Sequence, residues 1–330
     1  MHFLPIRGKN TATRNINTVF VMGGTHGNER TGIHAIQYLQ QHEQAFKQGT
    51  VNNIKVIWGN EKAVQRNSRY IQEDLNRCFL YDYDNPHSEE SYNAALLKET
   101  SYERKRALEI RYEMNALSKP VDFLIDLHTT TSQMENCLIV SDNDPWTDAL
   151  CGLVIKSVPN TRLYYDPVSR QKDLTSSSLG LNHITIEMGA IQQGVPDHDA
   201  VQNTLTLITA IITAVDHLNN QPTQALPQPP SKYTGLPYNI DYPRDSNGFP
   251  SAIIHPAFMH KDFQPLKVGQ PLFKGFNGKV IYLEENASIP NELITLINQA
   301  SIVPVFIGEA AYIEKGIAFR TAQYYNPALK

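Results

Sequence analysis

The sequence predicts an α/β protein in which a mixed sheet is flanked by helices and is followed by a smaller β-rich region. Strand-like and helix-like segments alternate over the first two-thirds of the 330 residues, which is typical of a mostly parallel or mixed sheet covered on both faces. Proline, glutamine and serine then accumulate, as in a linker. Beyond them, short apolar runs separated by Gly and Pro indicate strands and turns. We therefore expect a first domain over 1–218, a linker over 219–235 and a β-rich domain over 236–330.

The individual elements follow from apolar runs and their spacing. Five apolar runs are expected to be strands of the first domain: 17–22, 54–58, 121–127, 137–141 and 183–188. Between the first two, Ile33, Ile36 and Leu39 recur at helical spacing within 29–46. A single long helix is predicted over 88–118, because a serine suits its start and a proline follows its end. The remaining elements are expected to be helices over 201–218 and 290–299 and strands near 252–254, 278–283 and 302–307.

Composition and charge exclude several classes of function. The net charge of −4 and the pI near 6.3 provide no basic field that would recruit nucleic acid or an anionic membrane. The N-terminal residues lack the apolar segment of a signal peptide, and no run approaches the ~18–20 apolar residues of a membrane span. Cys78, Cys137 and Cys151 are too few and too scattered for a disulfide framework or a thiolate zinc site. We expect a cytoplasmic protein that binds neither nucleic acid nor membrane.

The turn that follows the first predicted strand carries the most informative motif. Residues 23–29 read Gly-Gly-Thr-His-Gly-Asn-Glu and place His26 three positions before Glu29. The strand predicted over 121–127 leads in the same way to His128. Because ligands of open α/β sheets gather at the carboxyl ends of strands, these three side chains can form a zinc set with one open coordination position. The alternative is that His26 packs in the turn while Glu29 opens a helix, where an acid suits the dipole.

Two further carboxylates stand at strand ends. Asp126 lies two positions before His128, so both side chains point to one face; it can orient His128 from behind, or it can bond to backbone or to an arginine. Glu187 ends an apolar strand, where a carboxylate is costly to bury unless it is used or paired. We expect Glu187 to be the general base, which takes a proton from the attacking water and passes it to the leaving amine. A structural ion pair is the alternative.

A short polar segment supplies candidate substrate-binding groups. Arg69, Asp74, Asn76 and Arg77 fall within nine residues. Guanidinium groups bind planar oxyanions in a bidentate manner, so the segment suits recognition of a carboxylate and polarisation of an amide carbonyl. Taken alone, it is also typical of a solvated surface loop. Asp74 is expected to hold one of the arginines in place.

Taken together, these motifs resemble the succinylglutamate desuccinylase/aspartoacylase family, which has a zinc carboxypeptidase-like fold. The matching pieces in the first domain are Gly-Gly-Thr-His26-Gly-Asn-Glu29, Arg69-Tyr-Ile, Asp74-Leu-Asn76-Arg77, Asp126-Leu-His128-Thr-Thr-Thr, Ile186-Glu187-Met-Gly and Gln193-Gly194-Val195. Those in the second domain are Asp241-Tyr242-Pro243-Arg244-Asp245 with Asn247-Gly248, Ile254-His255-Pro256 and Glu309-Ala310-Ala311-Tyr312. The resemblance is collinear over about residues 17–320.

The resemblance implies a metal centre and a base. By it, His26, Glu29 and His128 bind one zinc ion per subunit, and Glu187 is the general base.

The resemblance also implies how a substrate is held. Arg69 would polarise the scissile carbonyl and stabilise the oxyanion, a role shared with the metal. Asn76 and Arg77 would bind the substrate carboxylate, and Tyr312 would reach the substrate from the second domain. Glu309 would be an orienting or structural residue near the site. The second domain would cover the active-site cleft, which favours small acylated amino acids over peptides.

One departure from the family pattern concerns the substrate side chain. Aspartoacylases carry an arginine, with a tyrosine just before it, ahead of the catalytic glutamate. An ungapped alignment places Ser177 at the arginine position and Asp173 at the tyrosine position. The lost charge-assisted contact is worth roughly 1.5–3 kcal/mol. Either Arg170 or Lys172 substitutes, or the acylated amino acid is not aspartate.

The function predicted from the sequence is zinc-dependent amide hydrolysis of small-molecule N-acyl-L-amino acids. N-acetyl-L-aspartate, cleaved to acetate and L-aspartate, is the first choice of substrate. The alternatives are deacylation of N-acetylated aromatic or neutral amino acids, a metallocarboxypeptidase with an open cleft, and a zinc-binding module without catalysis. Glu187 and Arg69 argue against the module, which needs neither. Apolar strands of the C-terminal half could pair between subunits, so a homodimer is the oligomer to look for.

Overall fold

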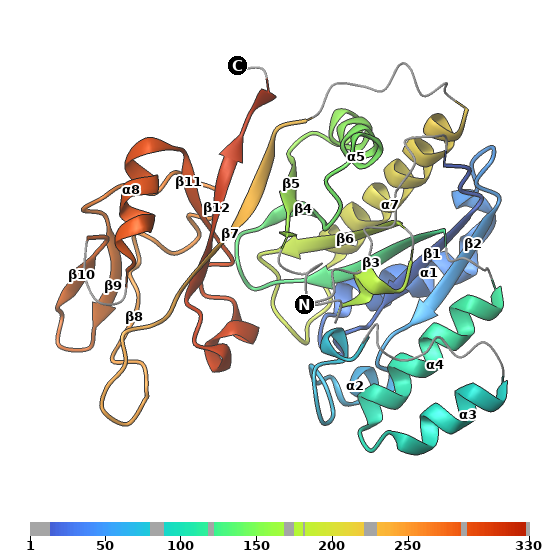
Figure 1. Ribbon diagram of the computed structural model, residues 1–330, viewed down its shortest axis with the longest axis horizontal. Coiled ribbons are helices and arrows are strands. Elements are labelled where there is room, and N and C mark those ends of the chain that lie inside the picture. The colour runs from blue at the N-terminus through green and yellow to red at the C-terminus, as the bar shows by residue number, and fades with distance from the viewer. Residues whose placement is uncertain are drawn as a thin grey trace, which may run out of the picture.

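A nine-stranded mixed sheet forms the centre of the computed structural model, which describes residues 14–79, 89–117, 122–167, 175–180, 182–220, 230–284 and 289–327. Its strands run in the order β11-β12-β7-β5-β4-β6-β3-β1-β2 (Figure 1). They are β1 (Thr18–Gly23), β2 (Asn53–Trp58), β3 (Phe123–Thr129), β4 (Glu135–Val140), β5 (Thr161–Tyr165), β6 (Asn182–Gly189), β7 (Lys232–Ile240), β11 (Ile302–Val305) and β12 (Phe319–Tyr325). Helices flank this sheet, so the predicted fold class is confirmed.

Strand direction decides where the functional side chains can meet. β2, β1, β3 and β6 run parallel to one another, whereas β4 runs antiparallel to β6. β5 is parallel to β4 and β7 to β5, and β12 is antiparallel to both β7 and β11. The carboxyl ends of β1, β3 and β6 therefore meet at one edge of the sheet, where ligands of α/β proteins bind.

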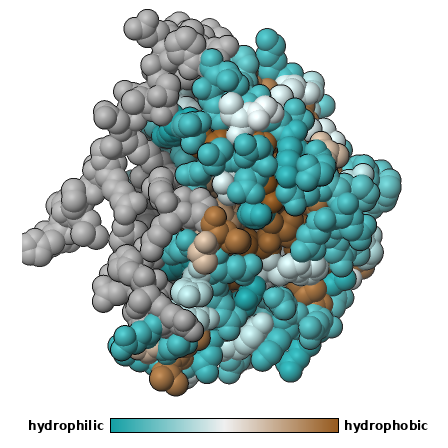
Figure 2. All heavy atoms as spheres, turned by 90° about the vertical axis from the view of Figure 1, so that its right-hand side faces the viewer, coloured by the Kyte–Doolittle hydropathy of each residue, from teal (hydrophilic) through white to brown (hydrophobic). Residues whose placement is uncertain are grey.

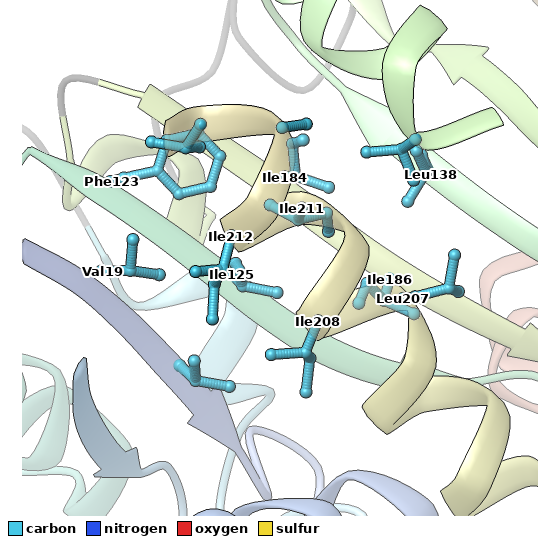
Figure 3. Packing of buried hydrophobic residues seen from close by; sticks show 14 of the residues in the cluster. Val19, Phe123, Ile125, Leu138, Ile184, Ile186, Leu207, Ile208, Ile211 and Ile212 are labelled. Atoms are coloured by element: carbon cyan, nitrogen blue, oxygen red, sulfur yellow. The ribbon is translucent and has the colours of Figure 1, made fainter. Parts of the chain in front are cut away.

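One face of the sheet is buried under three helices, α1 (Arg30–Phe46), α5 (Pro145–Ser157) and α7 (His198–Asn219). Figure 3 shows isoleucines of α7 directed at strand residues such as Ile125 and Ile184. Full burial of one such side chain contributes about 1.5–3 kcal/mol. This face is apolar throughout and provides the rigid base from which the strands present side chains on the other side.

The opposite face is apolar at its two ends and polar in its middle. At one end, an apolar cluster lies under α4 (Tyr102–Leu117) and contains Phe20, Met22, Ile110, Met114 and Leu124. At the other end, a second cluster contains Cys137, Tyr164, Val305, Phe306 and Ala322. Between them, β3 and β6 present Asp126, His128, His183, Thr185 and Glu187. The polar middle therefore marks the place of a site rather than of a core.

The prediction of a single long helix over 88–118 is wrong. The described part of this region forms two helices, α3 (Glu89–Lys98) and α4, rather than one. The side chain of Ser101 accepts a hydrogen bond from the backbone N–H of Arg104 at 3.1 Å, which is the geometry of an N-cap. Ser101 thus starts a second helix inside the polar stretch 98–106, which separates the apolar residues of the two helices.

Several elements were not predicted from the sequence. They are β5, β9 (Pro271–Gly275), β12, α5 and the short helix α2 (Glu61–Arg66), together with 3₁₀ turns at Leu75–Arg77, Ser176–Ser178 and Ala310–Lys315. β7 begins at Lys232, inside the stretch expected to be a linker, and joins the central sheet. Residues 221–229 of that stretch lie outside the described residues.

The C-terminal region builds its own core and also extends the central sheet. β8 (Ala252–Ile254), β9 (Pro271–Gly275) and β10 (Val280–Tyr282) form a small antiparallel sheet beside α8 (Asn291–Gln299). An apolar cluster that includes Leu272, Phe273 and Leu293 joins this sheet and helix to Ile240 and Phe319 of the large sheet. Figure 1 shows this lobe on the left, reached through β7, β11 and β12.

The end of the molecule opposite the C-terminal lobe has a mainly polar surface. Figure 2 looks onto the end that carries β2, α3 and α4, where hydrophilic residues dominate around a central hydrophobic patch and smaller hydrophobic areas. Among the described helices, none combines the length and the apolar character needed to cross a membrane.

Candidate active site

The turn after β1 is built to deliver two side chains at once. Gly24 has φ of +75°, a conformation that side-chain-bearing residues rarely adopt. A Cβ atom on Gly27 would lie 2.0 Å from the backbone carbon of Ala63, so only glycine fits against α2. This close packing fixes the turn and brings His26 and Glu29 to the carboxyl edge of the sheet, beside the end of β3.

His26, Glu29 and His128 form one buried cluster. Their potential ligand atoms all lie within 4.8 Å of one another. Nδ1 of His26 is 2.6 Å from Oε1 of Glu29, and Nδ1 of His128 is 3.1 Å from Oε2 of the same carboxylate. The two Nδ1 atoms are 3.2 Å apart. The residues predicted to bind metal are therefore brought together around one point.

The outer contacts of the two histidines fit a metal at that point. Nε2 of His26 lies 2.9 Å from Oδ1 of Asp74, and Nε2 of His128 lies 2.8 Å from Oδ2 of Asp126. With a metal bound on the Nδ1 side, each ring would carry its proton on Nε2 and donate it to a carboxylate. Nη2 of Arg69 also lies 2.9 Å from Nε2 of His26. Two imidazole nitrogens and one carboxylate are a donor set that suits zinc and leaves a position open. The residues present thus fit a catalytic zinc ion.

Charge–charge contacts keep the carboxylates of Glu29 and Asp126 ionised. Burial would raise the pKa of Glu29, but His26 and His128 outweigh it and hold that pKa below its usual range. Burial likewise opposes ionisation of Asp126, and His128 with the Ser176 hydroxyl still lowers the pKa of Asp126. A hydrogen bond from Thr25 Oγ1 at 2.8 Å also reaches the Asp126 carboxylate. Asp126 therefore supports His128, the first of its two predicted roles.

A pocket opens beside this cluster on the polar middle of the sheet. Thr185, Ile139 and Tyr164 are register neighbours across β6, β4 and β5 and line its floor. Glu187 is the register neighbour of His128, so its carboxylate belongs to the same wall as the predicted metal ligands. The pocket brings together all the predicted site residues: His26, Glu29, Arg69, Asn76, Arg77, His128, Glu187 and Tyr312.

Glu187 has the electrostatic surroundings of a proton acceptor. Burial raises its pKa to about 8; His128 and Arg69 oppose that rise, while the negative charges of Glu29 and Glu309 add to it. A carboxylate with a raised pKa holds a proton more readily than an ordinary one, which suits proton transfer near neutral pH.

The segment from Arg69 to Arg77 packs against the cluster rather than forming a solvated loop. Arg69 donates to Oε1 of Glu29 at 3.1 Å and to Oδ2 of Asp74 at 3.4 Å. Asp74 therefore holds Arg69, as expected, and also stands behind His26. The side chain of Asn76 accepts a hydrogen bond from the backbone N–H of Ser176 at 2.9 Å. Arg77 is exposed at the pocket mouth and donates to the Asn76 carbonyl at 2.6 Å.

The C-terminal region reaches the pocket through a turn docked on the end of β3. Glu309 is buried and accepts hydrogen bonds from Thr130 Oγ1, from the N–H of Thr131 at 2.8 Å and from Thr131 Oγ1 at 2.9 Å. Tyr312 follows on the 3₁₀ turn, and its ring lies 5.5 Å from that of Phe306. Glu309 is thus an anchor that places Tyr312 at the pocket.

Other lining residues were missed from the sequence. His183, Ser141, Asp166 and Arg320 also line the pocket. His183 and Ser141 sit in predicted strands, and the two-residue alternation of His183 with Thr185 and Glu187 could have revealed His183. Ser177 lines the pocket as well, whereas Asp173, Arg170 and Lys172 lie outside the described residues.

Comparisons with known proteins agree with this geometry. A family model described as the succinylglutamate desuccinylase/aspartoacylase catalytic domain matches residues 15–215, and one described as the AstE/AspA barrel-sandwich hybrid domain matches residues 237–323. A probable aspartoacylase from Nostoc sp. is 35% identical over 318 residues, covering 95% of this chain and 99% of its own. An N-acyl-aromatic-L-amino acid amidohydrolase (carboxylate-forming) from Xenopus tropicalis is 32% identical over 324 residues, covering 96% of each chain.

Solved structures share the fold. Murine aminoacylase 3 superposes with a TM-score of 0.76 at 28% identity, covering 95% of this chain and 97% of its own. Succinylglutamate desuccinylase from Vibrio cholerae shares the fold alone, with a TM-score of 0.56 at 15% identity over 94% of this chain and 82% of its own. These likenesses confirm the zinc carboxypeptidase-like α/β fold and the family expected from the motifs. The chain belongs to the succinylglutamate desuccinylase/aspartoacylase family.

Proposed function

We propose that this chain is a zinc-dependent amidohydrolase that cleaves N-acyl-L-amino acids to a carboxylate and a free amino acid. One observation carries the proposal: the Nδ1 atoms of His26 and His128 converge on Glu29 while both Nε2 atoms face carboxylates, next to a pocket that holds Glu187. One zinc ion per chain, held by His26, Glu29 and His128, would supply Lewis-acid polarisation of the amide carbonyl and acidify water.

The chain's own residues then account for the proton transfers. Glu187 takes a proton from the attacking water as its oxygen bonds to the amide carbon. The same proton passes to the amide nitrogen as the carbon–nitrogen bond breaks, so the amino acid leaves as a neutral amine and the acyl group as a carboxylic acid, which then ionises. Arg69, 3.1 Å from Glu29, stands beside the metal cluster and would stabilise the oxyanion of the tetrahedral intermediate.

The pocket mouth supports recognition of a substrate carboxylate. Arg77 is exposed there, and Asn76 is fixed by its contact with Ser176. Tyr312 reaches the pocket from the C-terminal turn. A cavity of about 130 Å³ suits a small acylated amino acid better than a peptide, since it is small beside the roughly 300–1,000 Å³ of drug-sized sites. Dipeptide cleavage is therefore the less favoured alternative.

N-acetyl-L-aspartate is the first substrate we propose, and the relative from Nostoc, named a probable aspartoacylase, supports it. Ser177 on the pocket wall favours a second candidate, an N-acetylated aromatic or neutral amino acid, and so does the name of the relative from Xenopus tropicalis. Both belong to one reaction class.

The test is amine release from a panel of N-acetyl-L-amino acids and dipeptides, with zinc-loaded and chelator-treated protein in parallel. We expect metal-dependent release from the N-acetyl amino acids and little from dipeptides. Zinc binding without turnover of any N-acyl substrate would instead indicate a module without catalysis. Efficient cleavage of dipeptides would indicate a metallocarboxypeptidase.

A further inference from the structure

A second buried cation lines the pocket, and it comes from the C-terminal strand β12. The side chain of Arg320 is only 13% exposed. Arg320 shares a face of β12 with Ala322, which belongs to the apolar cluster of Tyr164 and Phe306. Ala322 pairs with Val303 of β11 and Arg320 pairs with Val305, and both valines belong to the same apolar cluster. The strand therefore presents a guanidinium group to the pocket.

This guanidinium group is held at one end and has donors to spare. Nη1 of Arg320 donates to Oδ2 of Asp166 at 3.2 Å, and the Arg320 Cζ atom lies 5.9 Å from the centre of the Tyr164 ring. Among the described residues, Asp166 alone accepts a hydrogen bond from Arg320. A guanidinium has five N–H donors in a rigid fork. A contact through one of them leaves a planar edge that can bind a further carboxylate in a bidentate manner.

Arg320 is not one of the groups already assigned to the reaction, but it lines the same pocket. Tyr312 lies within electrostatic reach of Glu187, Arg77 and Arg320 together: burial raises its pKa, Glu187 adds to the rise, and the two arginines oppose it. The amide would lie near Glu187 and the α-carboxylate near Arg77. A side chain that extends from the same substrate then has Arg320 as a remaining positive partner on the pocket wall.

We propose that Arg320, positioned by Asp166, is the specificity-determining residue for the substrate side chain and selects N-acyl derivatives of acidic amino acids. The inference rests on the proposed amidohydrolase function and adds the side-chain class to it. Arg320 would take over the contact that Ser177 cannot make. It approaches from β12 rather than from the segment ahead of Glu187.

The competing interpretation is a purely structural ion pair that ties β12 to the segment after β5. Both side chains are largely buried, at 13% and 8% exposure, and a buried pair is weak support for stability by itself. If the pair is only structural, substitution of Arg320 should lower stability and should lower activity toward all substrates alike. If Arg320 determines specificity, the substitution should lower activity toward acidic substrates alone.

The experiment compares N-acetyl-L-aspartate with its neutral isostere N-acetyl-L-asparagine, for the zinc-loaded wild type and Arg320→Gln. We expect Arg320→Gln to lower kcat/KM for the aspartate derivative by about 10- to 100-fold, mainly through KM, because one charge-assisted contact is lost. The value for the asparagine derivative should change by less than about threefold, on the same scale. Arg162→Gln is the matched control: Arg162 pairs with Glu135 on the same sheet and does not line this pocket.

A second variant keeps the test decisive if Arg320→Gln does not fold. Arg320→Lys retains the charge but not the fork, so it should fold and still lose preference for the aspartate derivative. Equal losses on both substrates would overturn the inference and leave a structural pair. A wild type that turns over neutral N-acetyl amino acids but shows no preference for aspartate would overturn it while the proposed function stands. No turnover of any N-acyl amino acid would overturn both.

Discussion

Oδ2 of Asp126 lies 2.8 Å from Nε2 of His128, on the side of the ring away from Glu29. Glu29 lies on the other side of the ring, with its Oε2 atom 3.1 Å from Nδ1. With a metal ion bound on the Nδ1 side, the ring would carry its proton on Nε2 and donate it to Asp126. The two residues come from one strand and lie two positions apart, so the strand's own periodicity builds the support.

Replacing Asp126 by asparagine should weaken metal binding by about 10- to 100-fold, since outer carboxylates orient ligand histidines and raise their basicity. Competition titration against a chromogenic chelator measures this. Asp122→Asn is the control, because Asp122 precedes the same strand and lies away from the cluster. Unchanged zinc affinity in Asp126→Asn would show that this contact does not support a ligand.

Glu187→Gln should keep its metal and lose its activity. The amide cannot accept the proton that the mechanism assigns to Glu187, and loss of general-base catalysis costs about 10²–10⁴-fold. Zinc content and kcat are measured on the same preparation. Activity near that of the wild type would remove Glu187 from the mechanism, and loss of zinc would assign it to the metal site instead.

Glu309→Ala should destabilise the fold and reduce activity together. The substitution removes the shared acceptor of the Thr130 and Thr131 donors and leaves buried donors without a partner, which costs about 1–3 kcal/mol. It also frees the turn that carries Tyr312. Denaturant unfolding measures the loss against Glu314→Ala, an exposed acid of the same turn. Equal stability of the two variants would contradict an anchoring role.

His183 should make the fold less stable in acid. Burial lowers the pKa of His183 to about 4, with Asp126 opposing the shift and His128 adding to it. At a pH between the two values, the histidine of the unfolded chain, with a pKa of ~6.5, is protonated, whereas His183 of the folded chain is neutral. The free energy of unfolding is therefore highest above the pKa of the unfolded state, and it decreases as the pH falls toward the pKa of the folded state.

A comparison with His183→Gln isolates this titration from the other groups that ionise in acid. Between about pH 7 and about pH 5 the wild type should lose about 2 kcal/mol more unfolding free energy than the variant. Urea unfolding of chelator-treated protein at both pH values gives the difference. Parallel losses in the two proteins would mean that His183 titrates normally in the folded chain.

Local patterns predicted that His26, Glu29 and His128 converge but could not predict all of the pocket. His26, Glu29 and His128 follow apolar strands whose carboxyl ends meet, so their convergence is a consequence of parallel pairing. Asp166 and Arg320, in contrast, are 154 positions apart and meet only because β12 and β5 both flank β7. No spacing within one segment contains that relationship.

The errors in secondary structure have two causes. β5 carries a charged Arg162 among its five residues, and its ion pair with Glu135 of β4 exists only in the sheet. The break between α3 and α4 depends on a local contact, the capping bond of Ser101 to Arg104, inside a polar stretch that the prediction from a starting serine and a following proline did not divide. A tertiary contact decided the first case and a local cap the second.

The most direct test of the central claim is a zinc titration of metal-free protein, followed by amine release from N-acetyl-L-aspartate and N-acetyl-L-phenylalanine. The account predicts that release rises in proportion to added zinc and levels off at one equivalent per chain, because His26, Glu29 and His128 form a single site. Release from either substrate that is unaffected by zinc and by chelator, or no release at any zinc level, would contradict it.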